Sequence, residues 1–386
     1  MEITDLLMAT HKNKASDLHL SVKNPPIMRM NGDMLPLDMS QLGADEVKTM
    51  IYALMTEQQR SEFERDLELD FSISFSDEMR FRVNAFHNIN GAAAVFRTIP
   101  TKILSLDALG APEVLKKLCH LHKGLILVTG PTGSGKSTTL AAMVDYINTH
   151  FSKHILTVED PVEFVHKSKR SLINQREVGA STQSFAKALK SALREDPDVI
   201  LVGELRNLET IQLALTAAET GHLVMGTLHT SSAPKTIDRI IDVFPADDKE
   251  MVRAMLSVSI EAVIAQSLVK RSDGKSRVAA HEIMLGTPAI RNLIREGKIP
   301  QVSSMMQMGS KLGMTMMRDS LMRLFENGDI TGETFREATM TGASSDEESA
   351  GSAVHAPPPS PLPAKPAAAT TQSLKQAYAS NNNNSF

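Results

Sequence analysis

The sequence has little of several residue types, and each shortage limits what the protein can be. It contains one cysteine, Cys119, and no tryptophan among its 386 residues. One cysteine excludes a disulfide framework and a four-cysteine zinc site within a chain, so no zinc is expected. This usage fits a reducing cytoplasm, in which Cys119 is a small buried apolar residue. Residues 1–14 (MEITDLLMATHKNK) carry acids where an export signal has bases, which predicts that the protein is not exported.

Long apolar runs and a strong net charge are also missing. No stretch approaches the roughly 20 apolar residues that a membrane-spanning helix needs. The formal net charge is −4, and no basic groove with interleaved aromatic residues stands out, so nucleic acid is not expected as a partner. Hydrophobic residues, 22 of them methionine, make up 42% of the chain. This length and composition predict two domains with real cores and adaptable apolar surfaces.

What the sequence does contain is a glycine-rich loop between an apolar run and a helix-forming run. Residues 124–140 read GLILVTGPTGSGKSTTL, in which Gly130 and the 135–137 run have the spacing of a P-loop. Backbone N–H groups and the positive end of the following helix would hold phosphates. Lys136 would reach the β- and γ-phosphates, and Ser137 would ligate Mg²⁺. The alternative is a tight turn that needs glycine for its shape alone. The predicted nucleotide-binding residues are Gly130, Thr132, Gly133, Ser134, Gly135, Lys136, Ser137 and Thr138.

Residues 1–100 are predicted to form one α+β domain. A helical pattern at 44–66 precedes three alternating runs that can pair as an antiparallel meander. Asn31-Gly32 signals a hairpin turn. The predicted strands are 17–22, 27–30, 34–37, 69–75, 79–86 and 92–99, after a short helix from Ile3.

Arginines gather on one face of this meander. Arg80, Arg82 and Asn84 alternate with apolar residues, so they lie opposite the core, and Arg97 of the next strand can join them. A solvated charged face is the simplest interpretation of these residues when the domain is considered alone.

Residues 101–113 contain glycine and proline and are predicted to be a linker. From residue 114 to 341, strands and helices alternate, which is typical of a mainly parallel sheet covered by helices. Residues 342–386 hold six of the 18 prolines and no apolar period, which predicts a disordered tail. The predicted strands are 124–129, 154–158, 199–202, 223–228 and 278–284, and the predicted helices are 136–149, 184–194, 208–219 and 247–267, with shorter helices between 288 and 340.

Carboxylates follow two of the predicted strands, at the sheet edge where ligands bind in such folds. The run DVILVGE ends at Glu204 and is typical of a Walker B strand, so Glu204 would hold Mg²⁺ through water or polarise that water. The alternative is an acid that caps the next helix. In TVEDPVEF, Glu163 is the predicted general base that orients the attacking water. Glu159 and Asp160 would shape the site or meet the metal shell, since such close acids need a nearby cation.

Two histidines flank the strand predicted within the run ETGHLVMGTLHT. The strand between them spans roughly 23 Å at about 3.3 Å per residue, so His222 and His229 cannot both reach one phosphate. His229 would sense the γ-phosphate, whereas His222 would position loops or a subunit interface. Phosphoryl transfer often uses an arginine to neutralise charge, sometimes from a neighbouring subunit, but simple ion pairing is the alternative for each candidate. The candidate arginines are Arg194, Arg206 and Arg239.

Four motifs, GPTGSGKST, TVEDPVEF, DVILVGELR and ETGHLVMGTLHT, together resemble the secretion ATPase superfamily that powers type II secretion and type IV pili. The resemblance covers nearly all of residues 1–340. A further octamer, AIRNLIRE, is similar to a motif of the pilus-retraction branch. Assembly and secretion members usually carry a four-cysteine zinc module, which one cysteine excludes. An amphipathic surface helix explains the apolar stripe of the octamer but not its whole sequence. The octamer comprises Ala289, Ile290, Arg291, Asn292, Leu293, Ile294, Arg295 and Glu296.

The resemblance implies a PAS-like N-terminal domain, a RecA-like ATPase domain, and a homohexameric ring that binds ATP and Mg²⁺ between the two domains. In that setting Arg82 and Arg97 would reach the γ-phosphate. It also implies a cytoplasmic motor at the inner membrane. Its expected partners are a pilus platform protein of that membrane and an accessory retraction ATPase.

These motifs favour a motor that disassembles a pilus and so drives twitching motility. A motor for pilus assembly or type II secretion, or an accessory retraction ATPase, is the alternative within the same family. A ring that binds ATP and recruits partners with little turnover is a candidate from another class, although two carboxylate sites argue against it.

Overall fold

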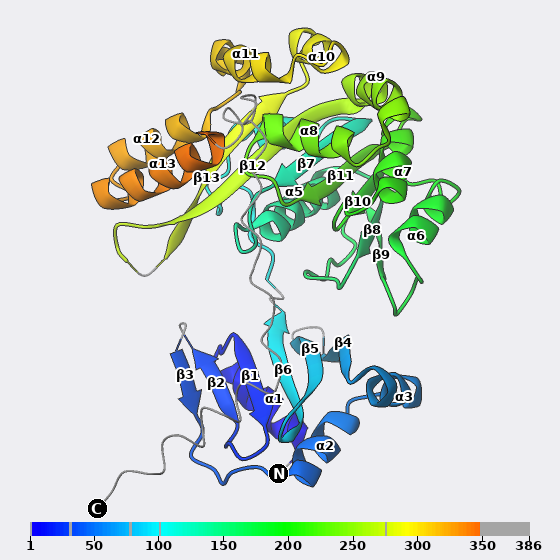
Figure 1. The fold of residues 1–386 in the computed structure, drawn as a ribbon, viewed down its shortest axis with the longest axis vertical. Helices are drawn as coiled ribbons and strands as arrows, with labels where there is room; N and C mark the ends of the chain where they lie inside the picture. Colours follow the sequence, from blue (N-terminus) through cyan, green and yellow to red (C-terminus); the bar gives the residue numbers. More distant parts are fainter. Residues whose placement is uncertain (1, 31–32, 77–78, 100–101, 275, 348–386) are drawn as a thin grey trace, which may run out of the picture. The chain divides into compact units, whose positions relative to one another are not determined.

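The computed structural model describes residues 2–30, 33–76, 79–99, 102–274 and 276–347 (Figure 1). The described residues up to 342 form one compact unit. This unit contains a six-stranded sheet, formed by residues up to 99, and a seven-stranded sheet that begins at residue 124. No helix in the described part of the chain is long and apolar enough to cross a membrane.

The first sheet has the order β3-β2-β1-β6-β5-β4, and all its neighbours are antiparallel. The predicted meander is therefore confirmed as β4-β5-β6. Side chains of Phe63, Phe81 and Phe96 are fully buried in the core of this part. Its elements are α1 (Ile3–Lys12), β1 (Asp17–Ser21), β2 (Ile27–Met30), β3 (Asp33–Pro36), α2 (Ala44–Tyr52), α3 (Glu57–Asp66), β4 (Glu68–Ser76), β5 (Met79–Asn88) and β6 (Gly91–Ile99).

The helical pattern at 44–66 is two helices rather than one. Thr56 lies between α2 and α3 and caps α3, because its hydroxyl accepts a hydrogen bond from Gln59 N at 3.3 Å. The Gln59 side chain accepts one from Thr56 N at 3.0 Å in return. This reciprocal capping box starts a new helix inside a pattern that reads as continuous.

The second sheet has the order β13-β12-β7-β11-β10-β8-β9. All its neighbours are parallel except β12 and β13, which confirms the expected mainly parallel sheet. Its strands are β7 (Gly124–Thr129), β8 (His154–Glu159), β9 (Leu172–Glu177), β10 (Val199–Val202), β11 (Leu223–Leu228), β12 (Ile260–Lys270) and β13 (Arg277–Leu285).

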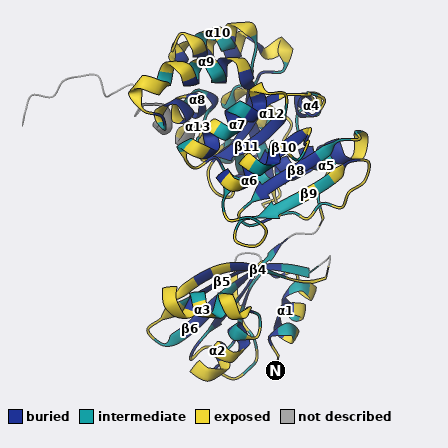
Figure 2. Cartoon of the chain, turned by 90° about the vertical axis from the view of Figure 1, so that its right-hand side faces the viewer, coloured by how far each residue is buried: buried dark blue, intermediate teal, exposed yellow. Residues whose placement is uncertain are grey.

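Helices cover both faces of this sheet, as Figure 1 shows. Leu125 and Leu127 of β7 pack into one core cluster, and Ile126 and Val128 pack into the other, because successive side chains of a strand point to opposite faces. All six residues of β7 are buried, as are those of the neighbouring strands β10 and β11, which are dark blue in Figure 2. The helices are α4 (Glu113–Leu118), α5 (Lys136–His150), α6 (Phe185–Ala192), α7 (Leu208–Glu219), α8 (Ala233–Asp242), α9 (Lys249–Ser259), α10 (Pro288–Arg295), α11 (Val302–Met308), α12 (Met317–Glu326) and α13 (Gly332–Glu347).

The predicted helix at 247–267 is wrong over its second half. Helix α9 ends at Ser259, and the chain continues directly into β12. Because β12 lies between β7 and β13, most of its residues are buried on both faces and show no period of two. An apolar run of this kind cannot be distinguished from a buried helix by periodicity alone. The polar edge strand β9 was not predicted.

The end of α13 differs from the predicted boundary at residue 342. The helix extends to Glu347, so residues 342–347 are helical rather than part of a tail. The rest of the predicted disordered tail, residues 348–386, lies outside the described residues.

Candidate active site

The glycine-rich loop joins the buried strand β7 to helix α5, which begins at Lys136. The Lys136 ammonium folds back across the loop and donates to Gly130 O at 2.8 Å and to Pro131 O at 3.1 Å. Burial lowers the pKa of Lys136, and the carboxylates of Glu204 and Glu163 partly offset this effect. A buried cation near two acids is therefore available at the start of the helix.

Parallel strands bring the predicted residues to one edge of the sheet, because their carboxyl ends coincide. Glu204 follows β10, and His229 follows the neighbouring strand β11. Thr227 fixes the turn that carries Glu204, since its hydroxyl donates to Gly203 O at 2.5 Å and its carbonyl accepts from Leu205 N at 3.0 Å. The acid is held from both sides by the next strand.

His229 lies between the Glu204 carboxylate and the Lys136 ammonium group. Its Nε2 lies 3.5 Å from Glu204 Oε1, and its Nδ1 lies 3.5 Å from Lys136 Nζ. An ammonium group can only donate, so Nδ1 accepts, and the ring proton on Nε2 faces the carboxylate. Arg206 occupies the second oxygen of the same acid, with 2.8 Å between its Nε and Glu204 Oε2.

The acidic loop after β8 is organised by Glu159. Its Oε1 accepts from Thr157 Oγ1 at 2.7 Å and from Gln175 Nε2 at 3.2 Å, and its Oε2 accepts from Glu163 N at 3.3 Å. Burial raises the pKa of Glu159, while these hydrogen bonds work in the opposite direction. With both oxygens engaged inside the protein, Glu159 shapes the loop that presents Glu163.

A second support of this loop, Glu177, escaped prediction from sequence. It ends β9, and its Oε2 accepts from Val162 N at 3.0 Å and from Arg80 Nη2 at 2.7 Å. Its Oε1 accepts from Ser72 Oγ at 2.6 Å. An isolated acid at the end of a polar strand belongs to no motif, so only the tertiary contacts identify it. Arg80, which had no predicted role, is its partner.

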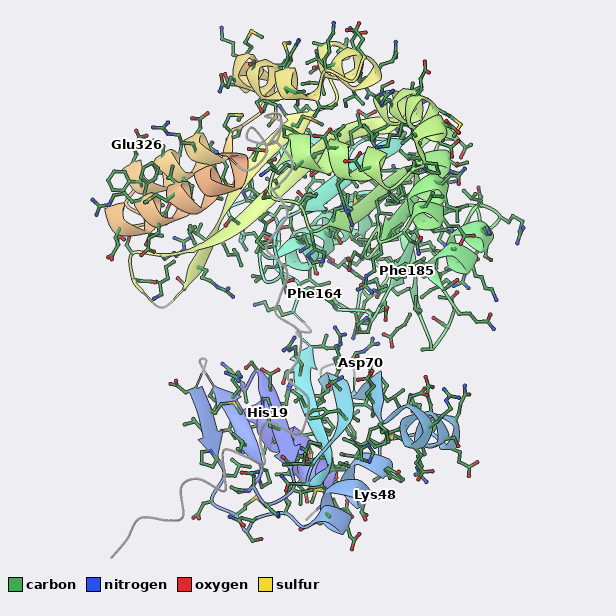
Figure 3. All side chains as sticks on the ribbon, in the orientation of Figure 1. His19, Lys48, Asp70, Phe164, Phe185 and Glu326 are labelled. Carbon is green, nitrogen blue, oxygen red and sulfur yellow. The ribbon has the colours of Figure 1, made fainter. Side chains whose placement is uncertain are left out.

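A cavity of about 680 Å³ lies at this edge, within the usual size of ligand pockets. Phe164 and Phe185, labelled in Figure 3, contribute apolar parts of its wall. Predicted residues that line it are Arg82, Arg97, Thr132, Gly133, Gly135, Lys136, Ser137, Thr138, Glu159, Asp160, Glu163, Glu204, Arg206 and His229.

Arg82 and Arg97 lie directly opposite each other on β5 and β6. Each has an acidic neighbour: Arg82 Nε is 3.7 Å from Asp70 Oδ1, and Arg97 Nε is 3.0 Å from Asp17 Oδ1. The two guanidinium groups thus bring positive charge to the cavity, moderated by carboxylates. Asp70 is labelled in Figure 3.

Other predicted residues lie elsewhere among the described residues. His222 precedes β11 at its opposite end, where Nδ1 lies 3.0 Å from Ala217 O, so the two histidines are separated by the strand as expected. Arg194 follows α6 and Arg239 belongs to α8, and both are exposed. The cavity lining leaves out Gly130, Ser134, His222, Arg194, Arg239 and residues 289–296.

The AIRNLIRE octamer overlaps α10 over residues 289–295, and one of its arginines, Arg291, faces inward, whereas Arg295 is exposed. Ile290 and Ile294 are fully buried. Arg291 donates through Nε to Gly286 O at 2.6 Å and through Nη2 to Glu261 Oε1 at 2.7 Å. Its Nη1 donates to the last carbonyls of α9, at Ser257 (3.2 Å) and Val258. Arg291 therefore joins α10 to the junction between α9 and β12.

Comparison with known proteins supplies the family. The family model described as "Type II/IV secretion system protein" matches residues 2–349. The chain belongs to this family.

Two similar proteins carry names from pilus retraction and twitching motility. The chain is 58% identical over 337 residues, 87% of its length and 98% of the relative's, to "Type IV pilus retractation ATPase PilT" of Pseudomonas aeruginosa. It is 57% identical over 319 residues, 83% of its length and 85% of the relative's, to "Twitching motility protein" of Neisseria gonorrhoeae. Among solved structures, "Crystal Structure of the Pilus Retraction Motor PilT and Bound ADP" matches with a TM-score of 0.82 and 47% identity, covering 88% of this chain and 97% of that one.

Proposed function

We infer that this chain is an ATPase that powers the retraction of type IV pili and thereby twitching motility. The observation that carries the inference is the convergence of Lys136, His229 and Glu204, through contacts of 3.5 Å, at the edge of one mainly parallel sheet. A similar protein at 58% identity bears the name of a pilus retraction ATPase, and a similar structure holds ADP.

The cavity residues divide the work of phosphoryl transfer. The P-loop N–H groups and Lys136 bind the phosphate chain of ATP, and His229 contacts the γ-phosphate side. Glu163 orients the attacking water and accepts its proton. Arg82 and Arg97 neutralise charge on the transferred group from the opposite wall.

Magnesium fits the oxygen donors of the same wall. Ser137 offers a hydroxyl and Glu204 a carboxylate, both lining the cavity with Lys136. Mg²⁺ prefers such oxygen ligands together with phosphate oxygens and water. When bound, the ion would neutralise phosphate charge, and Glu204 would hold it through water.

The motor works as a homohexameric ring at the cytoplasmic face of the inner membrane. Its nucleotide sits where arginines of the first sheet approach the P-loop, so a change in that approach would couple hydrolysis to movement. His222, Arg194 and Arg239 lie outside the cavity and suit subunit contacts. The ring would act on an inner-membrane pilus platform protein, with the exposed part of α10 as a contact, and alongside an accessory retraction ATPase.

Counting surface pili in a deletion strain tests this function. Loss of a retraction motor should leave an excess of pili and abolish twitching, and a plasmid copy should restore both. Loss of pili would instead identify an assembly motor, and unchanged pilus number and motility would contradict a role in pilus dynamics. A complementing Glu204→Ala copy, expressed at the wild-type level, should fail to restore twitching if turnover rather than scaffolding is required.

A further inference from the structure

We propose that Gln266 is a positioning residue that sets the shape of the P-loop from behind and so controls nucleotide affinity. The proposal rests on the proposed nucleotide site but concerns a residue of β12, outside the motifs and outside the cavity lining. Gln266 is 3% exposed, which is unusual for an amide side chain. A buried amide persists where its donors and acceptors are used.

Both ends of the Gln266 amide bind the P-loop segment. Its Nε2 donates to Ser134 O at 2.7 Å, and its Oε1 accepts from Thr139 Oγ1 at 2.7 Å. The amide orientation is fixed, because the Ser134 carbonyl can only accept. Ser134 lies in the loop, and Thr139 lies in the first turn of α5. One side chain therefore joins the loop to the helix that follows it.

The bond to Ser134 has a consequence for the phosphate side of the loop. In a planar trans peptide, the C=O of one residue and the N–H of the next point in opposite directions. Holding Ser134 O against Gln266 therefore aims the Gly135 N–H away from β12. Gly135 lines the cavity, whereas Ser134 and Gln266 do not. The amide thus orients one of the N–H groups that a phosphate chain would meet.

The two fixed glycines of the P-loop motif let the loop pack closely against Gln266 of β12. A Cβ atom on Gly130 would lie 2.3 Å from Gln266 O, and one on Gly135 would lie 2.8 Å from Gln266 Nε2. Both glycines also have positive φ, +141° and +87°. Their lack of a side chain therefore serves the contact with β12 as well as the contact with phosphate.

Binding of a fluorescent ADP analogue with magnesium to the purified full-length protein tests the proposal. Gln266→Leu removes both hydrogen bonds at similar volume and should weaken binding about tenfold, the scale of one buried hydrogen bond. The KM for ATP should rise with it. Ser320→Ala is the matched control, because Ser320 is also buried and its hydroxyl accepts from His281 N of β13 at 3.0 Å. This variant should lose thermal stability and keep its affinity.

Gln266→Glu supplies a rescue that a merely structural role would not produce. At neutral pH its carboxylate faces the Ser134 carbonyl and should weaken ADP binding. A protonated carboxyl donates and accepts as the amide does, so the affinity ratio to wild type should return toward one as the pH is lowered. If both Gln266 variants bind as tightly as Ser320→Ala, the proposal is wrong. If wild type binds no ADP, the proposed function fails instead.

Discussion

Carboxylates at the cavity differ in what they contact. This difference distinguishes a structural role from a catalytic one. Glu159 is engaged at both oxygens, whereas Glu163 contributes its backbone N–H to that network and its side chain lines the cavity. Glu163→Gln should therefore lower kcat by at least about 100-fold, the usual contribution of a general base. Binding of ADP should stay within about threefold of wild type, because the change is nearly isosteric.

Steady-state hydrolysis and ADP binding measured on the same preparation check this assignment. Glu219→Gln is a suitable control, because Glu219 is an exposed glutamate at the end of α7. An unchanged kcat in Glu163→Gln would remove Glu163 from the mechanism. A parallel loss of ADP affinity would indicate a binding role.

The single cysteine permits a second residue-scale prediction. Burial raises the pKa of the Cys119 thiol to about 12. Because the thiolate is the reactive form, a thiol reagent at neutral pH should leave the native protein unlabelled. In denaturant the reagent should modify one thiol per chain, which is the internal control. Rapid labelling of the native protein would contradict the buried environment.

Short motifs were enough to propose candidate residues where the chemistry needs local spacing. Lys136 and Glu204 were predicted from short motifs, and the structure brings both to one cavity with His229. Gln266 and Glu177 were not predictable in this way, because each acts on segments distant in sequence. Gln266 lies 132 residues from Ser134, and Glu177 lies 97 residues from Arg80.

At the scale of elements, α10 is fixed to its neighbours by Arg291. Removing this side chain would leave the Glu261 carboxylate and the α9 carbonyls without their donor. Arg291→Ala should therefore lower the free energy of unfolding by about 2 kcal/mol, as expected for lost hydrogen bonds at a half-buried charged pair. Denaturant unfolding of the purified protein measures this change.

Arg295→Ala is the matched control within the same helix. The Nε of Arg295 makes one weak contact, 3.4 Å from Ser257 Oγ, so its loss should cost less than about 0.5 kcal/mol. Equal stability of the two variants would contradict the anchoring role of Arg291. A motility defect in Arg291→Ala must then be compared with its stability before it is attributed to a partner.

The junction between α9 and β12 explains why the first part of β12 was predicted to be helical. Residues 260–265 are mostly apolar and follow α9 without a turn residue, so the sequence carries no stop signal. Pairing with β7 on one side and β13 on the other selects the strand. The parallel strands β7, β8, β10 and β11 were predictable because turn residues or acids bound their apolar runs.

At the scale of the whole molecule, buried histidines make stability depend on pH. Burial lowers the pKa of His166 and His281 to about 4, from 6.5 in an accessible imidazole. Between these values the unfolded chain binds protons that the folded chain does not. The contribution of these two neutral histidines to the free energy of unfolding should therefore be complete above pH 6.5. It should decline as the pH falls toward 4.

His281 offers the sharper test, because it lies in β13 away from the cavity lining. Within that window, each such histidine makes the free energy of unfolding rise by about 1.4 kcal/mol per pH unit, and this is the slope to be measured. His281→Gln should reduce the measured slope by this amount, whatever its effect on absolute stability. His122→Gln, at an exposed position, is the control for the same substitution elsewhere in the chain. An unaltered slope in His281→Gln would show that its imidazole titrates alike in the folded and unfolded chains.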